Sequence, residues 1–532
     1  KPTSQEDYLN IITPSNHRFT IQGLGLVQNY CQDDAIDSKQ YTVMLKDRLD
    51  RADRSNLNLE EYNVRIKIRR EQPIEGENAA VKQLLQNWKT ERKAFRLIRR
   101  WSFEGDGVRM DLSMVRQSPT VAERQGEYDW STTFLQHNIL SQIPRYEVEV
   151  EMLRNASTAT EDAALKALIR GVGEVLRAVQ KNTLLITKSL TTQVQREYRT
   201  MMGINEFRGV NPVTLEMKNM ISLIDPSIPN IRSSYNVTDK ADGLRAMGFI
   251  NQKGDLFLFD QSMNVYRTGL HNESCAGTLL DGEWVTLTSM GETVNHYMVF
   301  DIYYYGGENV STLPFVTFAE GMVDQGGNSR YSKMKEWQLK WRENTTLTAK
   351  GIGKERALLV ALKNFKFGSA NNLSIFQACS DILNAPHVYH TDGLILTSNS
   401  EPLPAEASAR FSQQFKWKPA KDNTVDFLIE YEKDEDIPNT DKVTSTILPS
   451  SGDTSIQYKT MRLFVGAESG AIYHNPRELI LRDAPIARER GGRSLLCARN
   501  PGRGLAHPRR NCASRGLVFA GRRARRGTLR RS

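Results

Sequence analysis

Four segments between residues 63 and 152 alternate polar and apolar side chains with a period of two residues, the pattern of a β-strand with one buried face. The segments are 63–69, 95–100, 108–114 and 146–152. The first three carry arginine or lysine on the polar face, and the last places Glu147, Glu149 and Glu151 in one row. This spacing predicts an antiparallel sheet with one apolar and one strongly charged face.

The charged face has two interpretations. A solvated outer face is ordinary for a half-exposed antiparallel sheet. However, three neighbouring carboxylates on one strand repel one another unless a cation neutralises them. A sheet closed around a polar interior, with the carboxylates on one wall, would bind a divalent metal together with a polyphosphate. The candidate phosphate-binding cations are Arg65, Lys67, Arg96, Arg100 and Arg109.

Charge is distributed unevenly along the chain. The formal net charge is +9, but residues 488–532 contain 14 Arg, one Glu and no Lys, a balance of +13 that leaves −4 for residues 1–487. Net charge therefore does not by itself indicate nucleic-acid binding. For the tail, a translated wrong reading frame or a cloning artefact is favoured over a basic RNA-binding arm, because the composition changes abruptly.

The five cysteines are scattered without metal-ligand spacing, which indicates reduced thiols. No apolar run approaches the roughly 18 residues of a membrane helix, so we expect no membrane association. The sequence begins with Lys1 and shows no signal or transit pattern. We expect the natural amino end to have been trimmed or lost.

Helical spacing follows the strands. An apolar stripe runs through 158–181, where Thr158 and Glu161 have the spacing of a capping box, and a second helix is expected from 183 to 202, before Gly203. Strand-like runs alternate with short helices and turns from about 209 to 430. The prediction is an α+β chain with domains at 1–205, 206–426 and 427–487, followed by the tail at 488–532.

An ordered series of motifs lies in the second of these domains. Each motif alone is weak, because Asp-Gly is common in turns. The motifs are Lys240-Ala241-Asp242-Gly243, Asp281-Gly282-Glu283, Phe300-Asp301, Asp392-Gly393-Leu394-Ile395 and Lys416-Trp417-Lys418. In this order, the five together resemble the covalent nucleotidyltransferase superfamily of mRNA capping guanylyltransferases and polynucleotide ligases. Asp-Gly-Leu-Ile and Lys-Trp-Lys-Pro are closer to the capping form.

The resemblance implies a role for each residue. Lys240 is the nucleophile that carries GMP from the substrate GTP, and a lysine can attack only when unprotonated, which nearby cations and burial favour. Arg245 and Glu283 would hold the ribose, and Phe300 would stack on guanine. The remaining expected roles are metal support by Asp392, phosphate contacts by Lys416 and Lys418, and a guanine-edge contact by Thr238.

The amino-terminal strands resemble the tunnel-shaped, metal-dependent RNA triphosphatases of large DNA viruses and fungi. This resemblance implies that Glu147, Glu149 and Glu151 hold Mg²⁺ or Mn²⁺ and that the arginines and lysines contact RNA phosphates. In that family a second Glu-x-Glu strand lies nearer the amino end. We find none here, so half of the metal-binding carboxylates are expected to be missing.

Together, the two regions resemble the fused capping enzymes of poxviruses, asfarviruses and mimivirus-like viruses. The expected fold is an antiparallel β tunnel of the triphosphate tunnel type, then a mixed α/β nucleotidyltransferase domain, then an OB-type lid without its final motif. The expected activities are removal of the RNA γ-phosphate and transfer of GMP to the diphosphate end. The implied partners are triphosphate or diphosphate RNA, GTP, and a viral RNA polymerase or methyltransferase subunit, in the host cytoplasm or the virion.

Two alternatives remain open. The first is an ATP-dependent RNA or DNA ligase, which has the same fold and the same lysine. The second is a non-catalytic RNA-binding subunit whose motifs are relics. Covalent labelling with GTP rather than ATP separates the first alternative from a capping enzyme, and any covalent adduct excludes the second.

Overall fold

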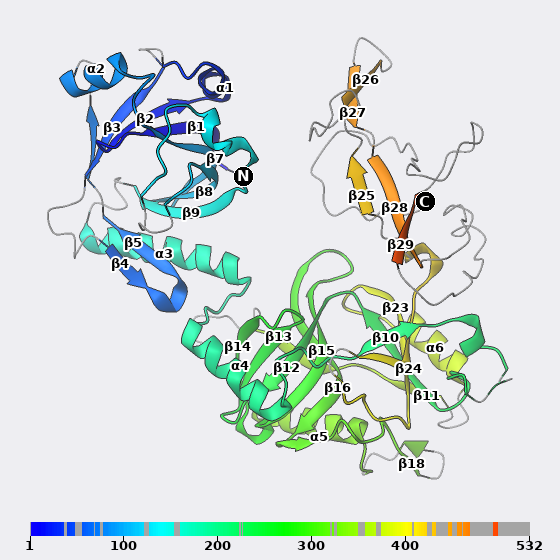
Figure 1. Cartoon of the computed structure of the whole chain (residues 1–532). Helices are drawn as coiled ribbons and strands as arrows, with labels where there is room; N and C mark the ends of the chain where they lie inside the picture. Colours follow the sequence, from blue (N-terminus) through cyan, green and yellow to red (C-terminus); the bar gives the residue numbers. More distant parts are fainter. Residues whose placement is uncertain are drawn as a thin grey trace, which may run out of the picture. The chain divides into compact units, whose positions relative to one another are not determined.

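The structure is a computed structural model of the 532-residue chain (Figure 1). It describes residues 2–422 except 37–39, 48–55, 69, 75–77, 122–126, 154–159, 223–224, 226, 320–321, 324–326, 349–356, 369–373 and 407–408. Beyond residue 422 it describes five strands, given below. The fold is mixed α+β and consists mostly of strands, as the sequence predicts.

The amino-terminal region contains a seven-stranded antiparallel sheet in the order β6-β3-β2-β1-β7-β8-β9. In the described residues, β6 and β9 are its two end strands, and no pairing joins them. Three of the four predicted strands are β7, β8 and β9. The strands are β1 (Ser4–Ile12), β2 (His17–Gln22), β3 (Thr42–Asp47), β6 (Arg70–Ile74), β7 (Ala94–Gly105), β8 (Val108–Gln117) and β9 (Arg145–Met152).

Helices cover the apolar face of this sheet. Side chains from α1 (Leu24–Asp33) and α2 (Ala79–Gln86) join a core that includes Phe19, Trp88 and Phe95. The longer α3 (Glu161–Gln180) packs on β8 and β9, where a Cβ added to Gly171 would lie 3.0 Å from Val108 and 3.1 Å from Val150. Glycine therefore allows the close approach of this helix to the sheet.

The fourth predicted strand has a different partner. It is present as β5 (Val64–Lys67) but pairs with β4 (Asn56–Leu59) in a separate hairpin. Because β3 and β6 pair directly with each other up to Asp47 and Arg70, the hairpin is an insertion between two sheet strands. Alternation predicts that a segment is a strand but does not specify its neighbour.

The observed N-cap of α3 lies two residues beyond the predicted cap. Thr160 caps the helix, and its side chain accepts a hydrogen bond from the Ala163 N–H, whereas Thr158 lies outside the described residues. The next helix, α4 (Lys188–Met202), ends at Gly203 as predicted, in the left-handed conformation with φ 69°.

An eight-stranded sheet forms the centre of the next region. Its main path is β17-β16-β15-β12-β13-β14-β20, and β21 pairs in parallel with β16. The strands are β12 (Leu244–Ile250), β13 (Asp255–Asp260), β14 (Val265–His271), β15 (Thr278–Leu287), β16 (Thr293–Tyr305), β17 (Glu308–Asn309), β20 (Thr346–Leu347) and β21 (Leu359–Leu362).

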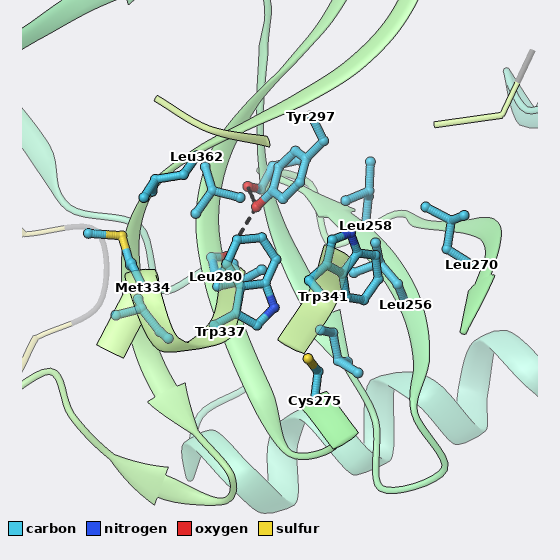
Figure 2. Close-up of a cluster of buried hydrophobic side chains, with 14 of the residues drawn as sticks. Leu256, Leu258, Leu270, Cys275, Leu280, Tyr297, Met334, Trp337, Trp341 and Leu362 are labelled. Carbon is cyan, nitrogen blue, oxygen red and sulfur yellow. Dashed lines mark hydrogen bonds between the residues drawn. The ribbon is translucent and has the colours of Figure 1, made fainter. Parts of the chain in front are cut away.

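Both faces of this sheet are buried. On one face, α5 (Arg330–Asn344) contributes Trp337 and Trp341 to a cluster with Leu280 and Tyr297, shown in Figure 2. The Tyr297 hydroxyl donates to the Leu280 carbonyl at 3.2 Å, so even the polar atom of this core residue is satisfied. On the other face, α4 packs Tyr198 against aromatic side chains of β12 and β13.

A five-stranded sheet, in the order β10-β24-β23-β11-β22, carries the lysine motif. Its neighbours include α6 (Ile375–Asn384), which packs on β11 and β22, and the short hairpin of β18 (Phe318–Ala319) and β19 (Met322–Val323) follows β17 along the chain. The strands are β10 (Asn211–Thr214), β11 (Tyr235–Ala241), β22 (Lys366–Phe367), β23 (Thr391–Ser398) and β24 (Arg410–Trp417).

The chain divides into two compact units, residues 1–391 with 395–415, and residues 392–394 with 416–532. The second unit contains a three-stranded sheet and a hairpin. The sheet is β25 (Leu428–Tyr431), β28 (Met461–Glu468) and β29 (Arg493–Cys497), and the hairpin is β26 (Ser445–Pro449) with β27 (Ser455–Lys459). The last strand, β29, lies within the arginine-rich segment.

No helix in the described part of the chain combines the length and the apolarity that a membrane crossing requires.

Candidate active site

The lysine motif forms a tight turn between two strands. Lys240 is near the end of β11, and β12 begins at Leu244. The Asp242 N–H donates to the His390 carbonyl at 2.9 Å, and a Cβ added to Gly243 would lie 2.7 Å from the Trp284 carbonyl oxygen. The turn therefore requires glycine, and Lys240 is held on a rigid strand rather than on a free loop.

Arg245 is locked by a buried carboxylate. Its guanidinium donates to both Asp281 oxygens, at 3.0 and 2.5 Å, and also to the Val210 carbonyl. The Arg245 side chain is 13% exposed and that of Asp281 is 1% exposed. This two-pronged geometry fixes the orientation of the guanidinium.

Glu283 lies opposite Arg245 on the neighbouring strand β15. Burial raises the pKa of this carboxyl to about 7, although the positive charges of Lys363, Arg245 and Lys240 oppose the rise. Near neutral pH the group is therefore divided between its acid and its carboxylate forms, and can donate or accept a hydrogen bond. Either form suits a ribose hydroxyl.

Phe300, on β16, presents a half-buried ring to two cations. The centre of the Arg245 guanidinium lies 5.6 Å from the ring centroid, and the Lys363 ammonium lies 5.7 Å from it. The adjacent Asp301 makes a buried ion pair with Arg330 at 2.8 Å, which anchors this strand. A partly open aromatic ring of this kind can stack on a planar base.

Lys363 is a site residue that sequence reasoning missed. It directly follows β21, and its ammonium lies 3.2 Å from Asp239 Oδ2 and donates to the Asp239 carbonyl at 2.8 Å. The signal that could have found it is the apolar run from Ala357 to Leu362, which ends at this single charge. A lysine at the end of a buried strand needs a polar or charged partner, but the apolar run does not identify that partner.

Thr238, the predicted guanine-edge contact, is buried. Its hydroxyl donates to the Asn364 carbonyl at 2.8 Å. The structure thus assigns this hydroxyl a partner in the neighbouring backbone, and its contact with guanine stays a prediction.

The last two motifs belong to the second unit. Lys418 Nζ lies 2.6 Å from Asp392 Oδ2, and Lys416 is exposed. A Cβ on Gly393, which has φ 142°, would lie 1.9 Å from the Trp417 carbonyl oxygen, so the backbones of the two motifs meet at a glycine. The joining of these residues with Lys240 in one site stays a prediction.

The polar face of the amino-terminal sheet brings together three predicted arginines and all three predicted glutamates. Arg96 reaches Glu147 at 2.7 Å, Arg100 reaches Glu149 at 2.9 Å, and Arg109 reaches Glu151 at 2.5 Å. Arg65 and Lys67 are not part of this face. They lie on the β4–β5 hairpin, where Arg65 donates to Asn58 at 2.8 Å.

Asp111 adds a carboxylate that sequence reasoning did not assign to a metal. It is fully buried, and neither of its oxygens makes a hydrogen bond in the described structure, although Arg100 and Arg109 place nitrogens 3.0 and 3.3 Å from Oδ2. One oxygen from each of Asp111, Glu149 and Glu151 lies within 4.8 Å of the others. Such a set of carboxylate oxygens suits a hard divalent cation. Glu147 lies outside this group.

A further carboxylate comes from the amino end. Glu6 on β1 is the register partner of Arg100, and therefore lies on the polar face. Its carboxylate accepts hydrogen bonds from Gln22, at 2.8 Å, and from the Tyr8 hydroxyl. The sequence analysis missed this strand because Tyr8 stands two residues after Glu6, where a Glu-x-Glu motif has its second carboxylate.

Comparison with known proteins gives independent information on the region that contains the lysine site. Residues 177–420 match the family model of the mRNA capping enzyme, catalytic domain. The chain therefore contains a capping-enzyme catalytic domain and is a relative of the mRNA-capping enzymes.

Three relatives show the extent of this similarity. The probable mRNA-capping enzyme of Acanthamoeba polyphaga mimivirus is 24% identical over 383 residues, 65% of this chain and 30% of that protein. The mRNA-capping enzyme of African swine fever virus (isolate Pig/Kenya/KEN-50/1950) is 29% identical over 195 residues, 37% of this chain and 18% of that protein. The mRNA-capping enzyme of Danio rerio is 25% identical over 240 residues, which are 43% of this chain and 35% of that protein. The chain spans about a third or less of the length of these relatives.

Proposed function

We propose that this chain acts in mRNA 5′ capping and transfers GMP from GTP to a diphosphate RNA end through Lys240. The observation that carries the proposal is the rigid placement of Lys240 on β11, where its charge interacts with that of Glu283. Both residues lie in the region that matches the capping-enzyme model. Arg245 and Phe300 supply the fixed cation and the aromatic ring that a ribose and a base require.

The chemistry balances in two steps. The unprotonated Lys240 amine attacks the α-phosphorus of GTP, a phosphorus–nitrogen bond forms, the bond to the bridging oxygen breaks, and pyrophosphate leaves while the nitrogen loses a proton. The terminal phosphate oxygen of the RNA then attacks the same phosphorus, the phosphorus–nitrogen bond breaks, and the Lys240 nitrogen takes up a proton and leaves as the free amine. Lys416 and Lys418 are proposed to contact the phosphates, and Asp392 to support a divalent cation, which would stabilise charge on the phosphate oxygens.

Nucleotide labelling tests this proposal. The full chain is incubated with Mg²⁺ or Mn²⁺ and with GTP or ATP labelled at the α-phosphate, and is then run on a denaturing gel. We expect label from GTP only, none in Lys240→Ala, and full labelling in the control Lys253→Ala, which changes an exposed lysine of the same domain. Label from ATP would indicate a ligase instead, and no label from either nucleotide would contradict the proposal.

We further propose that the polar face of the amino-terminal sheet removes the RNA γ-phosphate. Support comes from the buried Asp111 beside Glu149 and Glu151, a fit to a divalent cation, and from the row of Arg96, Arg100 and Arg109 for phosphate oxygens. The mimivirus alignment is also longer than the matched catalytic domain. A tunnel-type closure of this sheet and an OB-type lid in the second unit belong to the same proposal.

The biological setting is also a proposal. Two of the relatives described above are viral capping enzymes. We therefore propose that the chain acts on viral transcripts, in the host cytoplasm or the virion, beside a viral RNA polymerase or methyltransferase subunit. Co-purification of the tagged chain from infected cells would test this setting.

A further inference from the structure

A buried charge cluster lies directly beside Lys240 and has no role in the chemistry above. Asp239 precedes Lys240 on β11, and its side chain is 3% exposed. The Lys363 ammonium, also 3% exposed, lies 3.2 Å from Asp239 Oδ2, and the Tyr389 hydroxyl donates to the same oxygen at 3.0 Å. Three segments far apart in the sequence thus converge on one carboxylate.

The cluster is directional. Burial and the neighbouring Asp239 raise the pKa of Tyr389, so its hydroxyl keeps its proton and can only donate to the carboxylate. Lys363 forms an ion pair with the side chain of Asp239 and donates a hydrogen bond to its backbone carbonyl. These contacts hold the Asp239 carboxylate toward Lys363 and Tyr389.

The pairing of Asp239 matters for the protonation of Lys240. Lys240 must lose a proton before it can attack, and an uncompensated carboxylate on the adjacent residue would favour the ammonium form. The other buried carboxylates of the site are already paired, Asp281 with Arg245 and Asp301 with Arg330. Glu283 lies in the field of three cations. Among the described residues, the titratable side chains of Asp242 and His390 also lie near the turn; they are 3.4 Å apart and both are exposed.

We propose that Lys363 and Tyr389 are positioning residues that neutralise and hold Asp239, and thereby keep its carboxylate from stabilising the protonated form of Lys240. The inference rests on the proposed function, because it concerns the nucleophile of that reaction. Asp239 and Tyr389 thereby affect the protonation of Lys240 without contacting the nucleotide.

The pH dependence of adduct formation tests the inference. Single-turnover rates of covalent labelling by GTP are measured in the full chain from pH 6 to pH 9, for wild type, Lys363→Met, Tyr389→Phe and the double variant Asp239→Asn/Lys363→Met. We expect Lys363→Met to move the midpoint upward by about one pH unit, roughly a tenfold slower rate below the midpoint. Tyr389→Phe, which keeps the ring, should move it less in the same direction. The double variant removes both charges and should return the midpoint close to that of wild type.

Lys253→Ala is the matched control, because it removes an exposed lysine of the same domain and should leave the midpoint unchanged. A uniform loss of rate at every pH in Lys363→Met and Tyr389→Phe, with unmoved midpoints, would overturn the inference. A double variant shifted as far as Lys363→Met would overturn it as well. If Lys363→Met does not fold, Tyr389→Phe alone decides by its midpoint. Absence of a GTP adduct in wild type would instead refute the proposed function on which the inference rests.

Discussion

The ion pairs of the amino-terminal sheet and those of the nucleotidyltransferase domain use the same residue types in different environments. On the polar face of the sheet, the carboxylates of Glu147, Glu149 and Glu151 are 33%, 47% and 51% exposed, although Asp111, which pairs with Arg100 and Arg109, is buried. In the catalytic domain, Asp239, Asp281 and Asp301 are 1% to 4% exposed, and each is paired with an equally buried or nearly buried cation.

This difference in burial implies different tasks. Exposed pairs contribute little to stability and exchange partners readily, so a metal or a phosphate can replace either member. Buried pairs are strongly destabilising to break, because the remaining charge has no partner, and they hold a fixed geometry. The sheet thus carries a face suited to ligand exchange, whereas the catalytic domain carries a preorganised frame around Lys240.

The largest expected effect concerns the independence of the two regions. Glu149→Gln replaces one carboxylate of the three-carboxylate group by a neutral amide, and we expect γ-phosphate release from triphosphate RNA to fall by about 100-fold or more. GTP labelling of Lys240 should remain at the wild-type level. Parallel assays of the two activities on one preparation provide the measurement, and Glu174→Gln, at an exposed position on α3, is the control. Loss of both activities would contradict two separate sites.

Breaking a buried pair should destabilise the fold strongly. Arg330 is fully buried and pairs with Asp301, so Arg330→Met leaves a buried carboxylate uncompensated. We expect the free energy of unfolding to fall by about 3–5 kcal/mol, measured by urea denaturation. The double variant Asp301→Asn/Arg330→Met should recover part of this loss. A change of less than about 1 kcal/mol in the single variant would contradict the assigned difference in burial.

The pH dependence of stability should reveal Glu283. Because its pKa in the folded state is raised to about 7 from an ordinary value of 4.5, its contribution to stability is complete below pH 4.5 and is lost as the pH rises toward 7. The glutamine in Glu283→Gln does not titrate, so the variant does not lose stability at this position as the pH rises. The variant should therefore become progressively more stable relative to wild type between pH 4.5 and pH 7, with a constant difference above about pH 8. Thermal unfolding of both proteins across this range is the measurement, and a flat difference would contradict the shifted pKa.

The smallest effect is expected at the exposed face. Arg96→Gln removes the partner of Glu147, and both side chains are about one-quarter to one-third exposed. The free energy of unfolding should change by no more than about 1 kcal/mol, and the change should shrink further in high salt. Urea denaturation at two salt concentrations checks both statements, and a loss as large as that in Arg330→Met would remove the contrast between the two regions.

The sequence predicts local features of this molecule well. Alternation identifies β7, β8 and β9, and the motif order identifies the catalytic domain, because both signals are contained in short segments. Partner choice is less predictable. The strand at Val64–Lys67 is recognisable, but its pairing with β4 depends on the direct contact of β3 with β6.

The site residues that the sequence did not reveal were missed for the same reason. Lys363 is separated from Asp239 by more than a hundred residues, and Asp111 becomes a candidate ligand only through its register with Glu149. Neither position has a local pattern that identifies its partner. Long-range pairing and burial decide their roles, and these come from the three-dimensional fold.

The identity of the acceptor atom is the most direct test of the central claim. The full chain is incubated with GTP and magnesium, digested, and analysed by mass spectrometry under conditions that preserve phosphorus–nitrogen bonds. We predict a guanylyl group on the peptide that contains Lys240, located at that lysine and absent from Lys240→Ala. A guanylyl group on any other residue, or an unmodified Lys240 peptide in a preparation that consumes GTP and releases pyrophosphate, would contradict the account.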